Sequence, residues 1–153
     1  MPDVATFDDP EFERWREAAD DALKAARDNA EGGWHNWACM IAEQAAQLAV
    51  KGLLHGVGRG DRARGHDLVR LLDAAAGTAG LAVTDAVREA AVRLSRHYQP
   101  TRYPDALPGG TPHSRYQAED AATARVDAGL LVDAVDEARA ALREAEQEQE
   151  DET

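Results

Sequence analysis

Residues 37–56 read WACMIAEQAAQLAVKGLLHG, and this stretch decides the fold. Its apolar residues recur every three or four positions, which is the spacing of one helical face. Glu43 is its only acid and a single lysine its only strong base. A helix with so little charge is typical of a protein interior, where Gln44 and Gln47 would need hydrogen-bond partners. We therefore expect residues 34–55 to form the central helix.

The rest of the chain is also rich in residues that favour helices. Of the 153 residues, 32 are alanine, and Ile41 is the only isoleucine. Alanine is the best helix former, whereas β-branched residues favour strands, so the composition predicts an all-α protein. Because alanine side chains bury little area, we expect the helices to gain further burial from a second copy of the chain, as in a homodimer.

Glycines and prolines divide the chain into further helical segments. They are residues 10–29, 66–76, 85–98 and 116 to about 142, with Tyr98 on the apolar stripe of the third segment and Ala122, Val126, Leu130 and Val135 as the stripe of the last. Together with the central helix they predict an up-and-down bundle of four to five helices. Residues 1–9 are expected to form an N-terminal arm, residues 10–142 the helical domain, and residues 143–153 a frayed or disordered acidic tail.

The net charge of −12 argues against general affinity for nucleic acid. The charge is unevenly distributed, however. Residues 1–31 hold ten acids and four bases, whereas residues 51–70 and residues 88–115 each hold five bases and two acids. The acids thus lie toward the ends of the chain and the bases in its middle.

The cellular setting is predicted from what the sequence lacks. Cys39 is the only cysteine, and no secretory leader opens the chain, so we expect a protein of the reducing cytoplasm. No apolar run reaches the roughly 18 residues that span a bilayer, so no membrane association is expected. No spacing typical of a metal site or of a phosphate-binding glycine loop is present, and we expect neither a metal nor a cofactor.

One segment interrupts the helical pattern: HYQPTRYPDALPGGTPHSRY, residues 97–116. It holds four of the six prolines and is rich in arginine, tyrosine and histidine. Loops of this length in small domains are uncommon and are usually functional or disordered. We interpret it as a stiff recognition loop that faces a nucleotide or a protein partner.

Several pieces taken in order resemble a known family. They are WACMIAEQAAQLAVKGLLHGVG, GHDLVRLL, LSRHYQPTRYPD and YQAEDAATARVDAGLLVDAV. Over about residues 10–140 the chain resembles the HEPN domain (higher eukaryotes and prokaryotes nucleotide-binding), in particular the group with an RYPD motif. The resemblance implies a helical bundle that pairs with another copy. It also implies a minimal nucleotidyltransferase as partner, in a toxin–antitoxin or similar pair.

Many members of this family act as metal-independent ribonucleases through an Arg-x(4–6)-His motif. Histidine suits removal of the 2′-hydroxyl proton, and arginine suits the phosphate. In this chain Arg59 and His66 have that spacing. The motif of active members lies later, near RYPD, where no pair fits. We therefore interpret His66 as a residue that caps and packs at a helix start, and the Arg59 loop as solvated.

The residues around the RYPD motif suggest a different use, in which arginine holds phosphate and tyrosine stacks on a base. The candidate nucleotide-binding residues are Arg96, His97, Arg102, Tyr103, Asp105, Arg115 and Tyr116. A structural alternative stays open, in which Tyr103 packs over the end of the bundle, Asp105 caps a turn and Arg102 pairs with an acid.

Three classes of function follow. The first is a nucleotide- or RNA-interacting HEPN module that works with a nucleotidyltransferase partner. The second is a ribonuclease toxin that uses Arg59 and His66 or a site shared across a dimer. The third is a scaffold dimer without a ligand. The absence of the later motif and the acidic net charge favour the first class, and leave enzymatic activity open.

Overall fold

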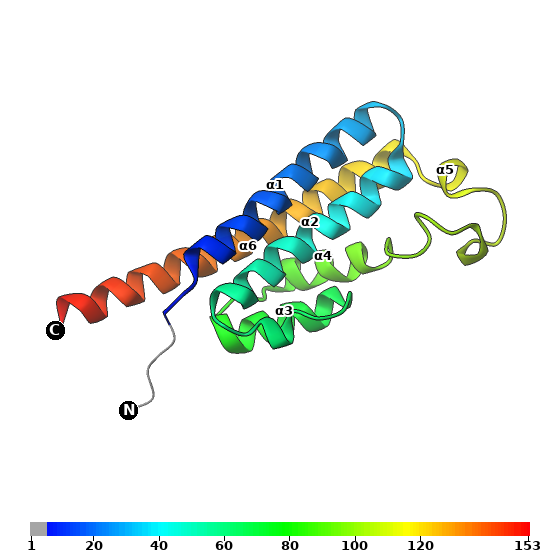
Figure 1. The fold of residues 1–153 in the computed structure, drawn as a ribbon. Helices are drawn as coiled ribbons and strands as arrows, with labels where there is room; N and C mark the ends of the chain where they lie inside the picture. Colours follow the sequence, from blue (N-terminus) through cyan, green and yellow to red (C-terminus); the bar gives the residue numbers. More distant parts are fainter. Residues whose placement is uncertain (1–5) are drawn as a thin grey trace.

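Six α-helices and two short 3-10 turns build the computed structural model, which describes residues 6–153 (Figure 1). The elements are α1 (Asp9–Glu31), α2 (His35–Gly56), η1 (Gly60–Arg62), α3 (Leu68–Ala79), α4 (Asp85–Ser95), η2 (Pro104–Ala106), α5 (Pro112–Arg115) and α6 (Ala118–Asp151). No strand occurs in this part of the chain. The predicted all-α class and helical bundle are confirmed.

The long helices α1, α2 and α6 lie side by side, and α3 and α4 pack beside them (Figure 1). Helix α2 contacts α1, α3, α4 and α6, as expected for the central helix. Most of its buried side chains are small or aliphatic, and Leu53 and Leu54 are fully buried. Asn36, Glu43 and Gln47 are the buried polar side chains of this helix. None of the helices between residues 6 and 153 combines the length and apolar character needed to cross a membrane.

Helix α2 carries glycines where it meets α1 and the segment before α1. A Cβ atom added to Gly52 would lie 2.6 Å from the Cβ atom of Trp15 on α1, and one added to Gly56 would overlap the ring of Phe7, which precedes α1. The indole ring of Trp15 stacks on the imidazole ring of His55 with centroids 4.8 Å apart. The two glycines therefore allow the aromatic side chains of Trp15 and Phe7 to pack directly against the backbone of α2.

The predicted stripe of the last helix is wrong except at its end. Val135 is buried, but Ala122 is exposed, Val126 is 66% exposed and Leu130 is 37% exposed. The face of α6 that packs on the bundle instead carries mostly alanine, with Leu131 among its larger side chains. Alanine positions allow the helices to come close, so the largest apolar side chains do not mark the core here.

The helix boundaries differ from the predicted ones at several points. Helix α3 continues through Gly77 to Ala79, and Gly80 ends it with a φ of 70°. Helix α4 ends at Ser95, so Tyr98 lies in the turns that follow rather than on a helical stripe. These turns are tight, because the backbone N–H of His97 donates to the carbonyl of Leu94, three residues before it.

Both ends of the predicted helical domain also differ. The expected arm at residues 1–9 falls in part on residues 1–5, which lie outside the described residues. Phe7 is buried, and the side chain of Asp8 caps α1, so the bundle begins before residue 10. Helix α6 continues to Asp151, through the region expected to be frayed or disordered.

The segment between α4 and α6 forms the long loop at one end of the bundle (Figure 1). It contains η2 and the short helix α5, and it lies at the end where α2 begins. This arrangement places the basic and aromatic residues of the loop beside the N-terminal end of the central helix.

Candidate functional site

Two residues of the long loop, Thr101 and His113, contact the start of α2. The Nδ2 atom of Asn36 donates to the carbonyl oxygen of Thr101 over 3.0 Å, and both residues are buried. The hydroxyl of Thr101 donates to the carbonyl oxygen of His97 over 2.5 Å. Further along the loop, the ring of His113 packs against the ring of Trp34 at the start of α2, with ring centroids 4.7 Å apart. The loop is therefore attached to the bundle on both sides of η2.

Arg102 occupies the turn next to this anchor. Its Nε and Nη2 atoms donate to the carbonyl oxygen of Tyr98 over 3.0 and 2.6 Å. Its guanidinium carbon lies 4.7 Å from the ring centre of Tyr98 and 5.2 Å from that of Tyr103. Tyr103 is 48% exposed. The arginine is thus held by a backbone carbonyl and by two aromatic rings, and one of these rings faces solvent.

His66 joins this group from the segment before α3. Its ring stacks on the ring of Tyr98, with centroids 4.9 Å apart and an angle of 21° between the planes. We call the four residues His66, Tyr98, Arg102 and Tyr103 the Arg102 cluster. It combines one cation, two tyrosine rings and an exposed imidazole on one surface.

A buried polar chain connects the Arg102 cluster with α2. The Nδ1 atom of His66 lies 3.2 Å from the Oε1 atom of Gln47, and the Nε2 atom of Gln47 donates to Oε1 of Glu43. Gln44 donates to the other oxygen of Glu43 over 2.7 Å. The two glutamines of the central helix therefore have the partners that their burial requires.

Glu43 is a fully buried acid on the central helix. Burial raises the pKa of its carboxyl group above the usual range, while the hydrogen bonds from Gln47 and Gln44 act in the opposite direction. The positive charges of Lys51 and Arg102 also lower this pKa. The site thus places a buried acid near the cation of Arg102.

His97 and Tyr116 form a second group on the other side of the loop. The Nδ1 atom of His97 lies 3.3 Å from the hydroxyl oxygen of Tyr116. Burial lowers the pKa of His97, against the effect of Asp120 and Asp127, and burial raises the pKa of Tyr116 to about 12.

A pocket of about 240 Å³ adjoins this second group. Its lining residues are Arg93, Arg96, His97, Glu119, Asp120, Thr123 and Asp127. Asp127 is buried and accepts two hydrogen bonds from Arg93, each of 2.9 Å. Acids outnumber the arginines on the lining, so this pocket is a poor match for a phosphate.

The seven residues predicted to bind a nucleotide do not share one pocket. Arg102 and Tyr103 belong to the Arg102 cluster, whereas Arg96, His97 and Tyr116 belong to the second group. Arg115 donates to the carbonyl oxygen of Gly109 within the loop over 2.8 Å. Asp105 lies exposed on η2. The predicted residues are therefore divided between the Arg102 cluster and the region of His97 and Tyr116, and Arg115 and Asp105 lie outside both.

Arg59 and His66, the pair with ribonuclease spacing, are held by different partners. Arg59 donates to both carboxylate oxygens of Asp61 over 3.0 and 3.1 Å. His66 contacts Gln47 and Tyr98, as described above. The capping residue of α3 is Asp67, whose side chain accepts from the backbone of Arg70 over 3.2 Å. The predicted capping role of His66 is therefore wrong, because Asp67 caps α3 and His66 only packs next to the helix start.

Sequence reasoning missed Tyr98, Asn36 and the connection between Glu43 and His66. Tyr98 was assigned to a helical stripe, because its spacing from Leu94 fits one. The polar residues of α2 gave the only usable signal, since a buried glutamine requires a partner from another segment.

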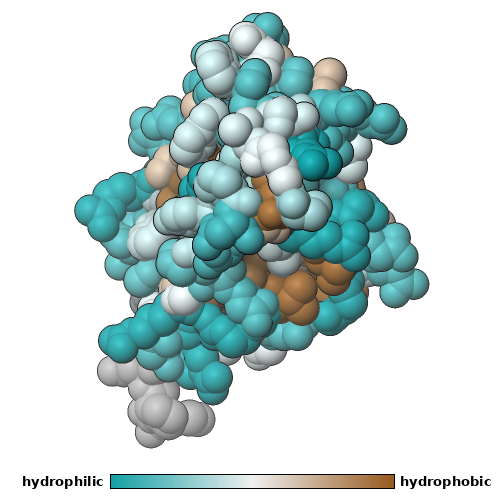
Figure 2. Space-filling model, turned by 90° about the vertical axis from the view of Figure 1, so that its right-hand side faces the viewer, coloured by the Kyte–Doolittle hydropathy of each residue, from teal (hydrophilic) through white to brown (hydrophobic). Residues whose placement is uncertain are grey.

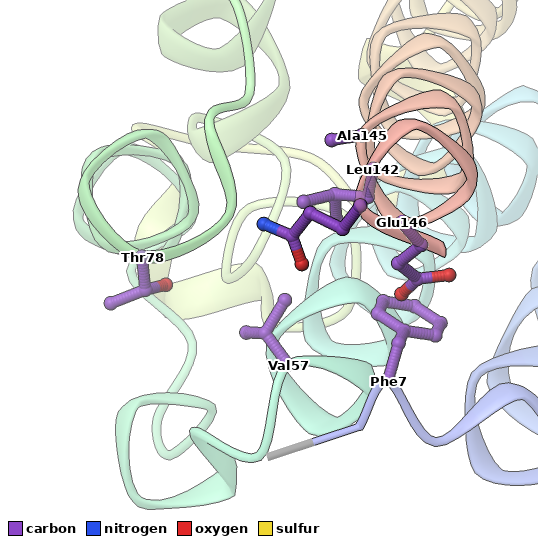
Figure 3. Close-up of a pocket in the computed structure, with 7 residues that line it drawn as sticks. Phe7, Val57, Thr78, Leu142, Ala145 and Glu146 are labelled. Carbon is purple, nitrogen blue, oxygen red and sulfur yellow. The ribbon is translucent and has the colours of Figure 1, made fainter. Parts of the chain in front are cut away.

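Elsewhere, a mostly apolar pocket of about 320 Å³ lies at the far end of the bundle (Figure 3). Its lining residues are Phe7, Val57, Thr78, Leu142, Ala145, Glu146 and Gln149.

Within residues 6–153, no three His, Cys, Asp or Glu side chains come together as metal ligands. Figure 2 views the molecule from the side of the long loop, where mostly hydrophilic residues surround a smaller apolar area. The Arg102 cluster is the arrangement best suited to a polar ligand.

Three comparisons place the chain among known proteins. The family model of the HEPN domain matches residues 12–146. The structure is similar to the crystal structure of TT1696 from Thermus thermophilus, with a TM-score of 0.77 and 35% identity, over 84% of this chain and 98% of that chain. The comparison with curated proteins found no significant match.

Two further crystal structures are similar. One is ST0689, described as an archaeal HEPN homologue, with a TM-score of 0.68 and 31% identity over 82% of this chain and 95% of that chain. The other is a HEPN domain protein, tm0613, from Thermotoga maritima, with a TM-score of 0.64 and 26% identity over 81% and 95% of the respective chains.

Proposed function

Because this chain belongs to the HEPN domain family, we propose that it acts as a nucleotide- or RNA-interacting module and that the Arg102 cluster is its binding surface. The observation that carries the proposal is the placement of Arg102 between the rings of Tyr98 and Tyr103. A guanidinium group can bind phosphate in bidentate fashion, and an exposed tyrosine ring can stack on a base.

The bonding of Arg102 leaves room for a ligand. Its Nε and Nη2 atoms are used by Tyr98, and no hydrogen bond within residues 6–153 uses its Nη1 atom. The two tyrosine rings and the backbone carbonyl already fix the side chain, so a phosphate would meet an arginine that loses little further freedom. The net charge of −12 supports a small or single-stranded ligand over extended duplex nucleic acid.

Titration calorimetry with ATP, GTP and a short RNA in the presence of EDTA tests this function. We expect saturable binding of at least one of them by the wild-type protein, weakened at least about tenfold by Arg102→Ala, since a charge-assisted hydrogen bond contributes about 1.5–3 kcal/mol. Arg14→Ala is the matched control, because Arg14 is exposed on α1 and pairs with Glu11 of the same helix. Unchanged binding by Arg102→Ala would overturn the proposal.

The same samples test the alternative, a metal-independent ribonuclease. Cleavage of the RNA in EDTA that is lost in both Arg59→Ala and His66→Ala would favour that function over simple binding. The contacts of Arg59 with Asp61, and of His66 with Gln47 and Tyr98, support the binding role instead.

We further propose that the module works in the cytoplasm as a homodimer and pairs with a nucleotidyltransferase in a toxin–antitoxin-like system. The exposed apolar side chains of Val126 and Leu130 on α6 support a partner surface. Light scattering after gel filtration tests the dimer: twice the mass of the chain is expected, and Val126→Lys should lower it toward a monomer. A monomer in the wild type would leave the scaffold alternative without support.

A further inference from the structure

The orientation of the Gln47 amide can be worked out from its neighbours. The Nε2 atom of Gln47 donates to the Glu43 carboxylate and also lies 3.5 Å from the carbonyl oxygen of His66. A backbone carbonyl can only accept, and so can a charged carboxylate. The nitrogen of the amide must therefore face these two oxygens, which turns the Oε1 atom of Gln47 toward the His66 ring.

This orientation determines which nitrogen of His66 carries the proton. The Oε1 atom of Gln47 lies 3.2 Å from the Nδ1 atom of His66 and can only accept a hydrogen bond. A neutral imidazole has one N–H group and one acceptor nitrogen. The proton consequently lies on Nδ1, and Nε2 is the acceptor.

Glu43 holds the Gln47 amide in the orientation that places the proton of His66 on Nδ1. It accepts from Gln44 as well as from Gln47, so both of its oxygens face N–H donors. A protonated carboxyl would place its own O–H against one of these donors. Burial raises the pKa of Glu43, whereas the two hydrogen bonds and the charges of Lys51 and Arg102 lower it. Because both of its oxygens accept from amide N–H groups, Glu43 fixes the orientation of Gln47, and Gln47 fixes that of His66.

The acceptor nitrogen of His66 is available to a ligand. His66 is exposed although its ring is stacked on Tyr98, and no hydrogen bond within residues 6–153 uses its Nε2 atom. The His66 ring and the Arg102 guanidinium lie 4.9 Å and 4.7 Å from the ring centre of Tyr98. A ligand that reaches both groups must carry a hydrogen-bond donor close to an anion. In a ribonucleotide the sugar hydroxyls meet this condition, because they lie a few bonds from the phosphate.

We propose that Glu43 and Gln47 are positioning residues that present the Nε2 acceptor of His66 to a ribose hydroxyl of the ligand. The proposal rests on the Arg102 cluster being the binding surface. It adds the reason why the cluster selects a ribonucleotide over a nucleotide that lacks the hydroxyl. It also gives a role to Glu43, the buried acid of α2.

The first test needs no ligand. Long-range ¹H–¹⁵N spectra of the labelled protein, recorded above the ordinary histidine pKa of about 6.5, distinguish the two neutral forms of His66. The His66 signals are assigned by their loss in His66→Gln. We expect the Nδ1–H form in the wild type. Gln47→Met removes the acceptor that holds this proton and should produce a mixture or the Nε2–H form. Gln44→Met is the matched control, since it touches Glu43 but not His66, and should keep the wild-type pattern.

The second test measures selectivity. Calorimetric titrations compare ATP with 2′-deoxy-ATP and 3′-deoxy-ATP for the wild type, Gln47→Met and Gln44→Met. We expect at least about a fivefold preference for ATP over one deoxy analogue, retained in Gln44→Met and reduced in Gln47→Met. Circular dichroism and thermal melts verify that each variant is folded.

The outcomes separate the two proposals. An Nε2–H form of His66 in the wild type, or a pattern that Gln47→Met leaves unchanged, would overturn the positioning role whatever the protein binds. Equal affinity for ATP and both deoxy analogues would overturn the selection of a ribose hydroxyl. If neither ATP, GTP nor RNA binds the wild type, the proposed function fails and the ligand half of this inference fails with it, while the spectra still decide the role of Glu43 and Gln47.

Discussion

The imidazole ring of His66 is stacked on the phenol ring of Tyr98, with centroids 4.9 Å apart. His66 comes from the segment before α3 and Tyr98 from the turns after α4, so the contact joins two separate parts of the chain. The carbonyl oxygen of the same Tyr98 accepts both hydrogen bonds from Arg102. One tyrosine therefore holds together the basic and the aromatic components of the candidate site.

Replacing Tyr98 should separate these components. Tyr98→Ala removes the ring that His66 and Arg102 share, so we expect nucleotide affinity to fall at least about tenfold and stability to fall by about 2–4 kcal/mol. Tyr98→Phe keeps the ring and should bind like the wild type. Titration calorimetry and urea denaturation measure the two effects. Wild-type affinity in Tyr98→Ala would show that the ring does not organise the site.

The anchor between Asn36 and Thr101 should control the order of the loop. Asn36→Ala leaves the buried carbonyl oxygen of Thr101 without its donor, which we expect to cost about 1–3 kcal/mol of stability. Amide hydrogen exchange should become faster in the loop around Thr101. Gln99→Ala, a change at an exposed side chain in the same loop, serves as the control. A loop that exchanges equally slowly in Asn36→Ala would mean that other contacts hold it.

An ion pair between a buried arginine and a half-exposed aspartate joins the two ends of the helical domain. Arg139 is 3% exposed, donates to both carboxylate oxygens of Asp9, and lies 3.7 Å above the ring of Phe7. Asp9→Ala removes the hydrogen bonds of this buried cation and leaves it only Glu146, whose oxygen lies 3.6 Å from Nη1, so we expect a loss of about 1.5–3 kcal/mol in the free energy of unfolding. Arg143→Ala removes a mostly exposed partner of the same Asp9 and should cost less than about 1 kcal/mol. Similar losses in the two variants would contradict the importance of burial.

The half-buried histidine of the second group, His97, should make stability depend on pH. Burial lowers the pKa of His97 below its ordinary value of 6.5, so the unfolded chain binds the proton more readily than the folded protein. The stability is therefore fully present above this value and declines as the pH falls through it toward the lowered pKa.

His97→Gln should remove this contribution. We expect the dependence of unfolding free energy on pH to flatten in this window, by at most about 1.4 kcal/mol per pH unit. Denaturation curves at a series of pH values provide the measurement. An equally steep decline in His97→Gln would assign the pH dependence to other groups.

The sequence was sufficient for the class of fold and for the central helix, because both depend on local properties. Alanine content, the near absence of charge in α2, and the spacing of its apolar residues are all visible in one dimension. The buried face of α6 is not visible in this way, since Ala128 faces the core while the larger Val126 faces outward. Which face of an alanine-rich helix is buried depends on its neighbours rather than on its own pattern.

Only part of the candidate site can be predicted from the sequence, because the remaining contacts depend on how separate elements pack. The composition of the loop pointed to Arg102 and Tyr103, and the structure places these two together. The contributions of His66 and Gln47 depend on how α2, α3 and the loop pack, and no spacing along the chain encodes that packing. Pairs that contact across separate elements can be found only once the elements are placed.

Photocrosslinking with 8-azido-ATP, followed by tryptic digestion and mass spectrometry, tests the central claim most directly, because it reports where a nucleotide lies. Cleavage after Arg96, Arg102 and Arg115 releases two peptides from the loop, residues 97–102 and residues 103–115. We predict that the adduct is found on one or both of these peptides or on residues 65–70, the tryptic peptide that holds His66, and that excess ATP competes it away. An adduct confined to other peptides, or one that ATP does not displace, would contradict the assignment of the Arg102 cluster as the binding surface.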